Sequence, residues 1–336
     1  MTLNQLKYLL GVVDNGLNIT AAAESLYTSQ PGISKQLRQL EHEVGAQLFS
    51  RRGKTLVALT PAGLQVVEYA RAIARNVDNI KSLGQELVAE QEGTLSIATT
   101  HTQARYVLPG IIQAFHERFP KVRLELHQGT SEQISAMVAR NTVDFAIATE
   151  SRELFPDMNL LPCFRWDRIV LTPLDHPLAG DDEPLTIEKL AEHPLITYVF
   201  SPNRESSFLR AFADKGLDPT VVFTARDADV IKTYVRMGMG VGVMAPMALT
   251  CDDLDSMYAI SANGLFPRVT TWLGMPRDRV LRGYMREFIA LFAPHWPKHA
   301  IEDAATAESQ QAVDEIAAGI TLPLKNGCTE GLQVAA

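Results

Sequence analysis

Residues 19–59 read ITAAAESLYTSQPGISKQLRQLEHEVGAQLFSRRGKTLVAL, and this stretch decides the fold of the N-terminal part of the chain. Pro31 suits the first turn of a helix, because the N–H group that proline lacks would be unpaired there. Apolar residues then recur at helical spacing, which predicts one buried face on that helix: Ile33, Leu37, Leu40 and Val44. Small and apolar residues at the same spacing before the turn predict a second helix packed closely against it.

The face opposite that apolar stripe carries short polar and cationic side chains. Such a face suits the major groove of DNA, where hydroxyl and amide groups read base edges and cations meet phosphates. The segment 51–59, RRGKTLVAL, predicts a cationic hairpin, or wing, directly after the helix pair. A charged outer face alone would be ordinary for any amphipathic helix pair, so the wing is what favours DNA binding. The candidate base-reading residues are Gln30 and Ser34, with Thr28, Ser29 and Pro31 at the turn; the candidate phosphate contacts are Lys35, Arg38, Arg51, Arg52 and Lys54.

The spacing of several motifs in this region closely resembles the winged helix-turn-helix of LysR-type transcriptional regulators. The family pattern is met by Ser29-Gln30-Pro31, Ser34, Leu40-Glu41, Gly45, Leu48-Phe49, Arg51 and Thr60-Pro61-Ala62-Gly63. The resemblance implies an α/β protein with an N-terminal winged helix-turn-helix, a long linker helix and a two-lobed α/β effector domain like that of periplasmic binding proteins. The expected boundaries are 1–60 for the DNA-binding domain, 61–92 for the linker (dimerisation) helix, 93–296 for the effector domain and 297–336 for a C-terminal tail.

Thr60-Pro61 predicts the start of the linker helix. Apolar or small residues follow at alternating steps of four and three: Val66, Ala70, Ile73, Val77, Ile80, Gly84 and Leu87. A heptad pattern over this length favours a helix that pairs with a second copy of the chain, although an amphipathic helix packed on its own domain would also show it. A dimer would place two recognition helices about 34 Å apart along DNA, or a multiple of that. The resemblance also implies a homotetramer.

From residue 93 onward, alternating strand and helix patterns predict α/β domains with largely parallel sheets. Strands are expected in TLSIATT, KVRLELHQG, TVDFAIATE, DRIVLTPL, PLITYVF and TVVFTA, and helices near 104–119, 131–140, 186–192, 204–215 and 227–237. By resemblance, lobe I comprises 93–162 and 268–296, and lobe II comprises 163–267. The chain would cross between the lobes near Pro162-Cys163 and Phe266-Pro267.

The charge is unevenly distributed along the chain. The net charge is −8, yet residues 31–60 hold five Lys/Arg against two Asp/Glu, and residues 93–336 hold 22 against 30. A small cationic patch on an acidic body favours one localised nucleic-acid surface.

The rest of the composition points to a cytoplasmic protein without membrane contact. The apolar run 8–13 is too short for a signal peptide, and glycines and Pro246 interrupt the later run 237–249. The three cysteines, Cys163, Cys251 and Cys328, lack metal-site spacing and suit free thiols in a reducing compartment. In the tail, 304–318 predicts one helix and the last ten residues predict disorder; we assign the tail no function.

The segment 98–105, ATTHTQAR, predicts a ligand site, because a strand runs into a helix there. Ligands of open α/β sheets bind at the carboxyl ends of strands, and helix N-termini attract anions. The neutral donors Thr100, Thr102 and Gln103 gather at that end, and Thr149 ends the strand 144–149. Threonines also cap helices commonly, but three clustered donors favour the anion site. A site made of donors suits fully ionised sulfate better than phosphate, whose proton needs an acceptor. Glu150 is the only nearby candidate acceptor.

Several segments resemble the CysB/Cbl group of LysR-type regulators, which control sulfur assimilation and cysteine biosynthesis. They are THTQARY, HQG at 127–129, DFAIATE, LPC, HPLAG and DADVIKTYVRMGMGVGVM. The resemblance implies that Thr100, Gln103 and Thr149 hold a small anion between the lobes. It also implies a lobe II threonine near residue 202, where this chain has Pro202, so Ser201 or Asn203 would have to stand in; Thr224 and Ala225 should line the same cleft. The implied effectors are sulfate, thiosulfate, O-acetylserine or N-acetylserine, and the alternative is a LysR-type regulator of another pathway with a different small anion.

The patterns do not favour an enzyme. Cys163 has no histidine partner at a defined spacing, and the glycines of 238–242 follow a helix where a phosphate loop would open one. A solute-binding protein would need a signal peptide and no helix-turn-helix. We therefore expect no catalytic residue, no cofactor and no metal, and as partners double-stranded DNA, the effector, further copies of the chain and RNA polymerase.

Overall fold

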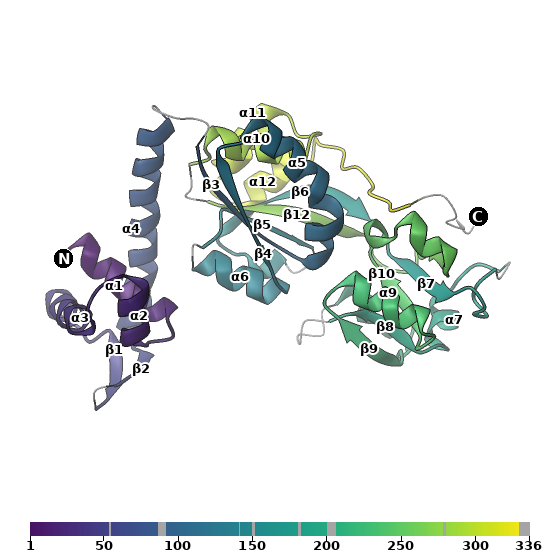
Figure 1. The fold of residues 1–336 in the computed structure, drawn as a ribbon, viewed down its shortest axis with the longest axis horizontal. Helices are drawn as coiled ribbons and strands as arrows, with labels where there is room; N and C mark the ends of the chain where they lie inside the picture. The colour runs from purple at the N-terminus through teal and green to yellow at the C-terminus, as the bar shows by residue number, and fades with distance from the viewer. Residues whose placement is uncertain are drawn as a thin grey trace. The chain divides into compact units, whose positions relative to one another are not determined.

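The computed structural model describes residues 1–53, 55–86, 92–140, 142–149, 152–180, 183–199, 206–277 and 280–328. Two compact units make up the chain: Met1–Glu90 with Asp278–Arg282, and Gln91–Arg277 with Gly283–Ala336 (Figure 1). None of the helices in the described part combines the length and the apolar character that a membrane span requires.

The first unit contains α1 (Leu3–Asp14), α2 (Ile19–Ser25), α3 (Gln30–Val44), β1 (Phe49–Arg52), β2 (Thr55–Leu59) and α4 (Pro61–Glu86). The strands β1 and β2 pair antiparallel, so the predicted helix-turn-helix and wing are confirmed. Ser29 caps α3 by accepting a hydrogen bond from the Gly32 N–H group, and Gly45 ends the helix in a left-handed conformation. Ile33, Leu37 and Leu40 are buried as predicted, whereas Val44 is exposed.

The first half of α4 packs against its own unit, which corrects part of the predicted dimer seam. Ala70 is 1 % exposed within the same apolar core as α1 and α3, and Val66 and Ile73 pack against that core. An ion pair of 2.6 Å between Arg71 and Asp14 ties α4 to α1. The apolar positions in the first half of the predicted seam therefore pack within the chain. Ile80 is 69 % exposed in the single chain. The exposure of Gly84 and all of Leu87 lie outside the described residues.

In the second unit, lobe I is built on one mixed sheet. Its order, among the described residues, is β4 (Val122–Gln128), β3 (Gly93–Thr99), β5 (Phe145–Thr149), β12 (Val269–Pro276) and β6 (Met158–Trp166). The strand β3 is parallel to β4 and β5, and β12 is antiparallel to β5 and β6. Its helical elements are η1 (Gln103–Val107), α5 (Leu108–Arg118), α6 (Ser131–Ala139), η2 (Arg152–Leu154), α10 (Gly283–Phe292), α11 (Lys298–Ala305) and α12 (Gln310–Ala317).

Lobe II repeats this plan. Its sheet has the order β11 (Met257–Ser261), β7 (Ile169–Pro173), β10 (Val241–Met244), β8 (Leu195–Tyr198) and β9 (Val221–Ala225). The helices α7 (Ile187–Ala191) and α8 (Ser207–Ala213) contribute to one apolar cluster and α9 (Ala228–Arg236) to another, with η3 (Pro246–Ala248) and η4 (Cys251–Asp255) following β10. The prediction of largely parallel sheets was wrong, because β7, β11 and β12 run antiparallel to their neighbours.

The first crossing between the lobes lies later than predicted. The strand β6 continues through Cys163 to Trp166, and Trp166 still pairs with Val269 of β12. The chain therefore leaves lobe I at 167–168, and it returns near 267–268, close to the second predicted crossing. The reason is that β6 is held along its whole length by β12, a strand from more than a hundred residues later.

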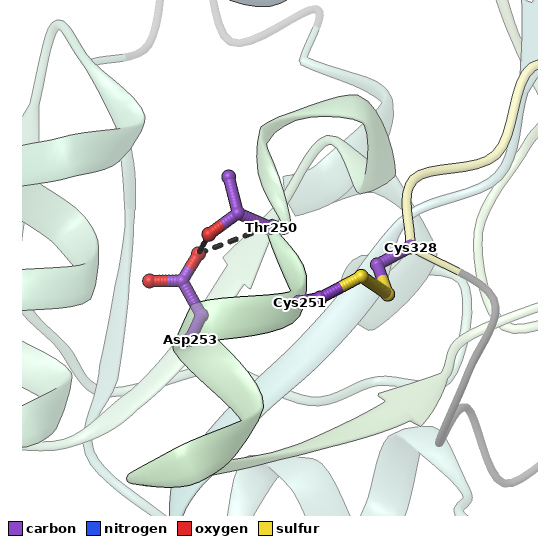
Figure 2. Close-up of a disulfide and its surroundings, with 4 residues drawn as sticks. All are labelled: Thr250, Cys251, Asp253 and Cys328. Carbon is purple, nitrogen blue, oxygen red and sulfur yellow. Dashed lines mark hydrogen bonds between the residues drawn. A yellow bond between two sulfur atoms is a disulfide. The ribbon is translucent and has the colours of Figure 1, made fainter.

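The C-terminal segment differs from the prediction up to residue 328, whereas the disorder expected for the last ten residues falls mostly on 329–336, outside the described residues. Two helices, α11 and α12, replace the single helix expected over 304–318. Beyond them, Leu324 forms a parallel bridge with Arg165 of β6. Cys328 forms a disulfide with Cys251, with their Cα atoms 5.5 Å apart (Figure 2). The prediction of three free thiols was therefore wrong for two of the cysteines, and Cys163 is free and buried.

Candidate effector site and DNA-binding surface

The recognition helix α3 presents its predicted contact residues to solvent. Ser29, Gln30, Pro31, Lys35 and Arg38 are exposed, and Thr28 and Ser34 are half-buried. The Gln30 side-chain amide donates a hydrogen bond of 3.2 Å to the Ser34 hydroxyl. The two predicted base readers therefore form one polar patch on the outer face of α3.

Glu41 fixes the position of the wing relative to α3. One carboxylate oxygen accepts hydrogen bonds from the Leu48 and Phe49 N–H groups, at 3.0 and 3.2 Å. The other oxygen lies 2.5 Å from the Arg51 guanidinium. Arg51, predicted as a phosphate contact, is thus also part of the support of the wing. Arg52 is exposed at the end of β1, and Lys54 lies outside the described residues.

The start of α4 requires a glycine at position 63. The Thr60 hydroxyl donates to the Gln47 carbonyl at 2.6 Å and accepts from the Gly63 N–H group at 2.9 Å. A Cβ atom at position 63 would lie 2.0 Å from the Leu48 carbonyl oxygen. The Thr-Pro-Ala-Gly motif therefore joins the linker helix closely to the wing.

A pocket of about 240 Å³ lies between the two lobes of the second unit. Lobe I contributes the ends of β3 and β5 and the N-terminus of α6, and lobe II contributes β8 and the loops beside it. The polar residues among its lining are Thr100, Thr102, Gln103, Thr130, Ser131, Glu132, Thr149, Glu153, Arg168, Thr197, Tyr198, Ser206 and Arg226. The structure thus brings together Thr100, Thr102, Gln103 and Thr149 at one site.

Gln103 is the most buried of these predicted residues. Its side chain is 1 % exposed, and its amide nitrogen lies 3.5 Å from the Thr271 hydroxyl. The same hydroxyl accepts a hydrogen bond of 3.2 Å from the Trp166 indole. The Gln103 side-chain oxygen is buried without a hydrogen-bond partner in the described part of the chain. Turning the amide over would let Thr271 donate to that oxygen and would leave the NH₂ group for an anion in the pocket.

Tyr198 links the two lobes at the pocket. Its hydroxyl lies 3.4 Å from the Thr102 hydroxyl of lobe I and accepts a hydrogen bond from the Ala245 N–H group of lobe II. Burial raises the pKa of Tyr198, so the phenol stays protonated and remains a donor. Arg168, on the crossing segment, also lines the pocket, and its guanidinium donates to the Ser207 hydroxyl at 2.9 Å.

One of the predicted effector residues that the structure describes does not line the pocket. Thr224 is exposed on β9 and is absent from the lining, because side chains alternate along a strand and its neighbour Ala225 faces the pocket. The structure therefore does not bring Thr224 together with the other predicted effector residues. Ser201 and Asn203 lie outside the described residues, as does Glu150.

Sequence reasoning missed Tyr198, Arg168 and Arg226 as pocket residues. Tyr198 and Arg226 each stand at or just beyond the end of a strand that the pattern predicted, so the strand-end rule that selected Thr149 could have found them. Arg168 could not be found in this way, because it lies on the segment where the chain crosses from lobe I to lobe II. The sequence predicts that crossing five residues earlier, at Pro162-Cys163.

A second set of contacts joins the lobes away from the pocket. The Tyr106 hydroxyl of η1 donates to the Asp229 carboxylate at 2.5 Å, and the Lys232 ammonium donates to the Tyr106 hydroxyl at 3.2 Å. Arg105 forms an ion pair of 2.7 Å with Asp229. Burial and the bond to Asp229 raise the pKa of Tyr106. The element η1 therefore carries Gln103 toward the pocket and Tyr106 toward α9.

One group of side chains has the composition of a metal site. His101, Asp227 and Asp229 offer ligand atoms within 4.8 Å of one another. Asp229 is already bonded to Arg105 and Tyr106, and Asp227 caps α9 through the Val230 N–H group. The nearby cations oppose a divalent ion, so protein contacts explain the group.

The comparisons agree with the division into a helix-turn-helix and a two-lobed domain. Residues 3–64 match the bacterial regulatory helix-turn-helix protein family of LysR type, and residues 89–297 match the LysR substrate binding domain. The chain belongs to the LysR family of DNA-binding transcriptional regulators.

The LysR-family relatives of this chain include CysB and Cbl regulators. The chain is 43 % identical to the transcriptional regulator CysB of Haemophilus influenzae over 97 % of this chain and all of that protein. It is 38 % identical to the regulator Cbl of Escherichia coli over 94 % of this chain and 99 % of that protein. The solved cofactor-binding domain of Cbl superposes with a TM-score of 0.61 at 40 % identity, covering 65 % of this chain and 95 % of that one.

Proposed function

We propose that this LysR-family regulator acts in the cytoplasm on genes of sulfur assimilation and cysteine biosynthesis, and that a small anion in the pocket between its lobes controls it. The similarity to CysB and Cbl regulators over nearly the whole chain supports the choice of pathway. We propose no enzyme activity for it. Its partners would be operator DNA, further copies of the chain in a dimer or tetramer, and RNA polymerase.

The donors at the pocket support an anionic effector. Thr100, Thr102 and Thr149 supply hydroxyl groups at strand ends, and the N-terminus of α6 contributes N–H groups beside Thr130 and Ser131. These groups can stabilise negative charge without a full counter-ion. Arg168 and Arg226 add positive charge at the lining.

The volume of the pocket bears on the size of the effector. A water molecule takes about 30 Å³ of liquid, so 240 Å³ leaves room beyond a single tetrahedral anion. The pocket is therefore large enough for an effector that joins an anionic group to an organic part, such as O-acetylserine or N-acetylserine, as well as for sulfate or thiosulfate. Glu132 and Glu153 also line the pocket and could accept the proton of phosphate, so the lining does not disfavour phosphate relative to sulfate.

Calorimetric titration of the full-length protein tests this proposal. Sulfate, thiosulfate, O-acetylserine and N-acetylserine would each be titrated into the wild type and into the Thr100→Val and Thr149→Val variants. Each substitution keeps the side-chain shape but removes a hydroxyl, and should cost about 1–2 kcal/mol of effector affinity. Thr224→Val is the matched control, because Thr224 lies outside the pocket lining, and it should bind as the wild type does.

The alternative is a LysR-family regulator of another pathway with a different small anion. It would be favoured if none of the four compounds binds while other carboxylates do. If the Thr100 and Thr149 variants bind every sulfur metabolite as tightly as the wild type, the effector site lies elsewhere and the proposal fails.

A further inference from the structure

Residues 320–328 form a segment, here called the C-terminal strap, that is bonded to lobe I. The Arg165 N–H group donates to the Pro323 carbonyl at 2.9 Å, and the Lys325 N–H group donates to the Arg165 carbonyl at 2.8 Å. The Lys325 ammonium lies 4.9 Å from the centre of the Phe164 ring. These contacts pair the strap with β6 through one short parallel bridge at Arg165, near the end of the strand that leads to the crossing at 167–168.

The same strap then reaches lobe II. The Cys328 N–H group donates to the Leu249 carbonyl at 3.2 Å. A Cβ atom at position 327 would lie 1.9 Å from the Pro246 carbonyl oxygen, so the strap approaches η3 as closely as a glycine permits. The disulfide from Cys328 to Cys251 completes this attachment (Figure 2). The strap therefore spans both lobes and is covalently fixed to the second.

The disulfide lies next to the network that joins the lobes. Cys251 is the first residue of η4, and Thr250 caps η4 through two hydrogen bonds to the Asp253 carboxylate, from its N–H group at 3.0 Å and its hydroxyl at 2.7 Å (Figure 2). Asp253 also accepts a hydrogen bond of 2.8 Å from Lys232, which in turn donates to Tyr106 of lobe I. Any movement of η4 would therefore displace Asp253 and, through Lys232, disturb the contact between Lys232 and Tyr106 that joins the lobes.

The two bonded cysteines are accessible to reagents in solution, unlike the third. Cys251 is exposed and Cys328 is half-buried. Cys163 is fully buried, and burial raises its pKa, so it stays an unreactive thiol. In a reducing compartment, which the proposed function implies, disulfides are usually transient, catalytic or redox-sensing. Exposed disulfides are the more labile ones.

We propose that Cys251 and Cys328 form a reversible thiol–disulfide site, through which low-molecular-weight thiols control how firmly the strap holds the two lobes together. Reduction proceeds by exchange. A thiolate attacks one sulfur and forms a mixed disulfide, which releases the other cysteine as a thiolate. A second thiol molecule then displaces the first cysteine. Two thiols lose two electrons and become one small disulfide, and the protein gains two electrons and two protons as two thiols; reoxidation by a small disulfide is the reverse exchange.

Release of the strap has a consequence for the pocket. The strap crosses the lobe junction and restrains the arrangement in which the pocket is formed, so its release lets the lobes sample other arrangements. An effector then binds a smaller competent fraction and its apparent affinity falls. This part rests on the proposed function, whereas the release of the strap itself does not.

Amide hydrogen exchange tests the release of the strap without any effector. The full-length protein would be compared after treatment with a small disulfide and after treatment with excess dithiothreitol, with mass spectrometry confirming a difference of two hydrogen atoms. Reduction should speed exchange in peptides covering 160–168 and 320–328 by about tenfold or more. In the Cys251→Ser and Cys328→Ser variants, amide exchange in these peptides should be fast under both conditions. The Cys163→Ala variant should respond to reduction as the wild type does. Equal exchange in the oxidised and reduced wild type would overturn the proposal.

Binding of sulfate and of N-acetylserine, used as probes, forms the second measurement. Reduction should weaken the binding of at least one probe about fivefold or more, and the Cys251→Ser variant should bind it as the reduced wild type does. Gly327→Ala should give the same weak binding without loss of either sulfur, because the added Cβ displaces the strap from Pro246. If every probe that binds does so equally tightly to the oxidised and the reduced protein, the link from strap to pocket is wrong. If neither probe binds at all, the effector proposal fails, and the exchange measurement still decides the thiol–disulfide site.

Discussion

The Lys232 ammonium lies 2.8 Å from the Asp253 carboxylate, and the two side chains are only 7 % and 8 % exposed. Burial alone would raise the pKa of Asp253, but the hydrogen bonds from Lys232 and Thr250 outweigh it and hold that pKa below its ordinary value. Burial likewise opposes the charge on Lys232, and the bonds to Asp253 and Tyr106 nevertheless raise its pKa. The pair is therefore charged in the folded protein at neutral pH.

Replacing Lys232 with Met should destabilise the effector domain by about 3–5 kcal/mol, because it leaves the Asp253 carboxylate buried without its main partner. Chemical denaturation of the full-length protein, followed at the domain's own transition, measures this change. Arg236→Met is the matched control: Arg236 lies 3.3 Å from the same carboxylate but is 45 % exposed, so its loss should cost no more than about 1 kcal/mol. Equal costs for the two variants would contradict the assignment.

The pH dependence of that cost has a definite sign. Since the folded-state pKa of Asp253 is lowered, its contribution is complete above the ordinary value of 3.8 and disappears as the pH falls through the lower folded-state pKa. The raised pKa of Lys232 makes its contribution complete below 10.5 and lost as the pH rises above that value. The difference between wild type and Lys232→Met should thus be constant near neutrality and shrink at both extremes.

The DNA-binding unit could be predicted closely because its signals are local. The proline that starts α3, the glycine that ends it and the apolar stripe all lie within one short stretch, so each favours the same structure. The role of Glu41 was missed, since nothing in the sequence shows that its carboxylate meets the Leu48 and Phe49 N–H groups. Such a contact depends on the folded position of the wing.

The effector domain was predicted less completely because its missing parts depend on distant pairings. The strand β6 contains Pro162, which argues against a strand, yet β12 holds it from the far end of the domain. Cys251 and Cys328 are separated by 77 residues, and their pairing requires the strap to return to lobe II. The sequence did predict four lobe I residues of the pocket, because the carboxyl ends of parallel strands meet at one edge of a sheet. These residues are Thr100, Thr102, Gln103 and Thr149.

The two kinds of DNA contact on the first unit should respond differently to substitution. Gln30→Ala should weaken binding to the operator by about 1–3 kcal/mol and leave binding to random DNA nearly unchanged, if Gln30, which is bonded to Ser34, reads base edges as we propose. Arg52→Ala should weaken binding to both DNAs and reduce the salt slope by about one unit. Fluorescence anisotropy over a range of salt concentrations measures both. Equal losses on the two DNAs for Gln30→Ala would refute the base-reading role.

Thr271 should position Gln103 for the effector. Thr271→Val removes the hydroxyl that contacts the Gln103 amide and the Trp166 indole, and should lower effector affinity by about 1–2 kcal/mol. Thr270→Val is the control, because the neighbouring side chain points to the other face of β12. In a Gln103→Ala background the Thr271 change should have little further effect on affinity. Independent, additive losses would mean that Thr271 does not act through Gln103.

Substitutions at Ile80 and Ile73 should have different effects, the first on assembly and the second on folding stability. Ile80 is 69 % exposed in the single chain, and the heptad pattern places it in a seam with a second copy. Ile80→Asp should therefore yield folded monomers, because a charge placed in the seam would be buried without a partner on association. Ile73 packs against the core of its own unit, so Ile73→Asp should instead lower the thermal stability of the DNA-binding unit. Analytical ultracentrifugation at micromolar concentration, combined with thermal denaturation, distinguishes the two effects. A wild-type protein that sediments as a monomer under these conditions would exclude the seam, and an Ile80→Asp variant that still sediments as the wild type does would place the interface elsewhere.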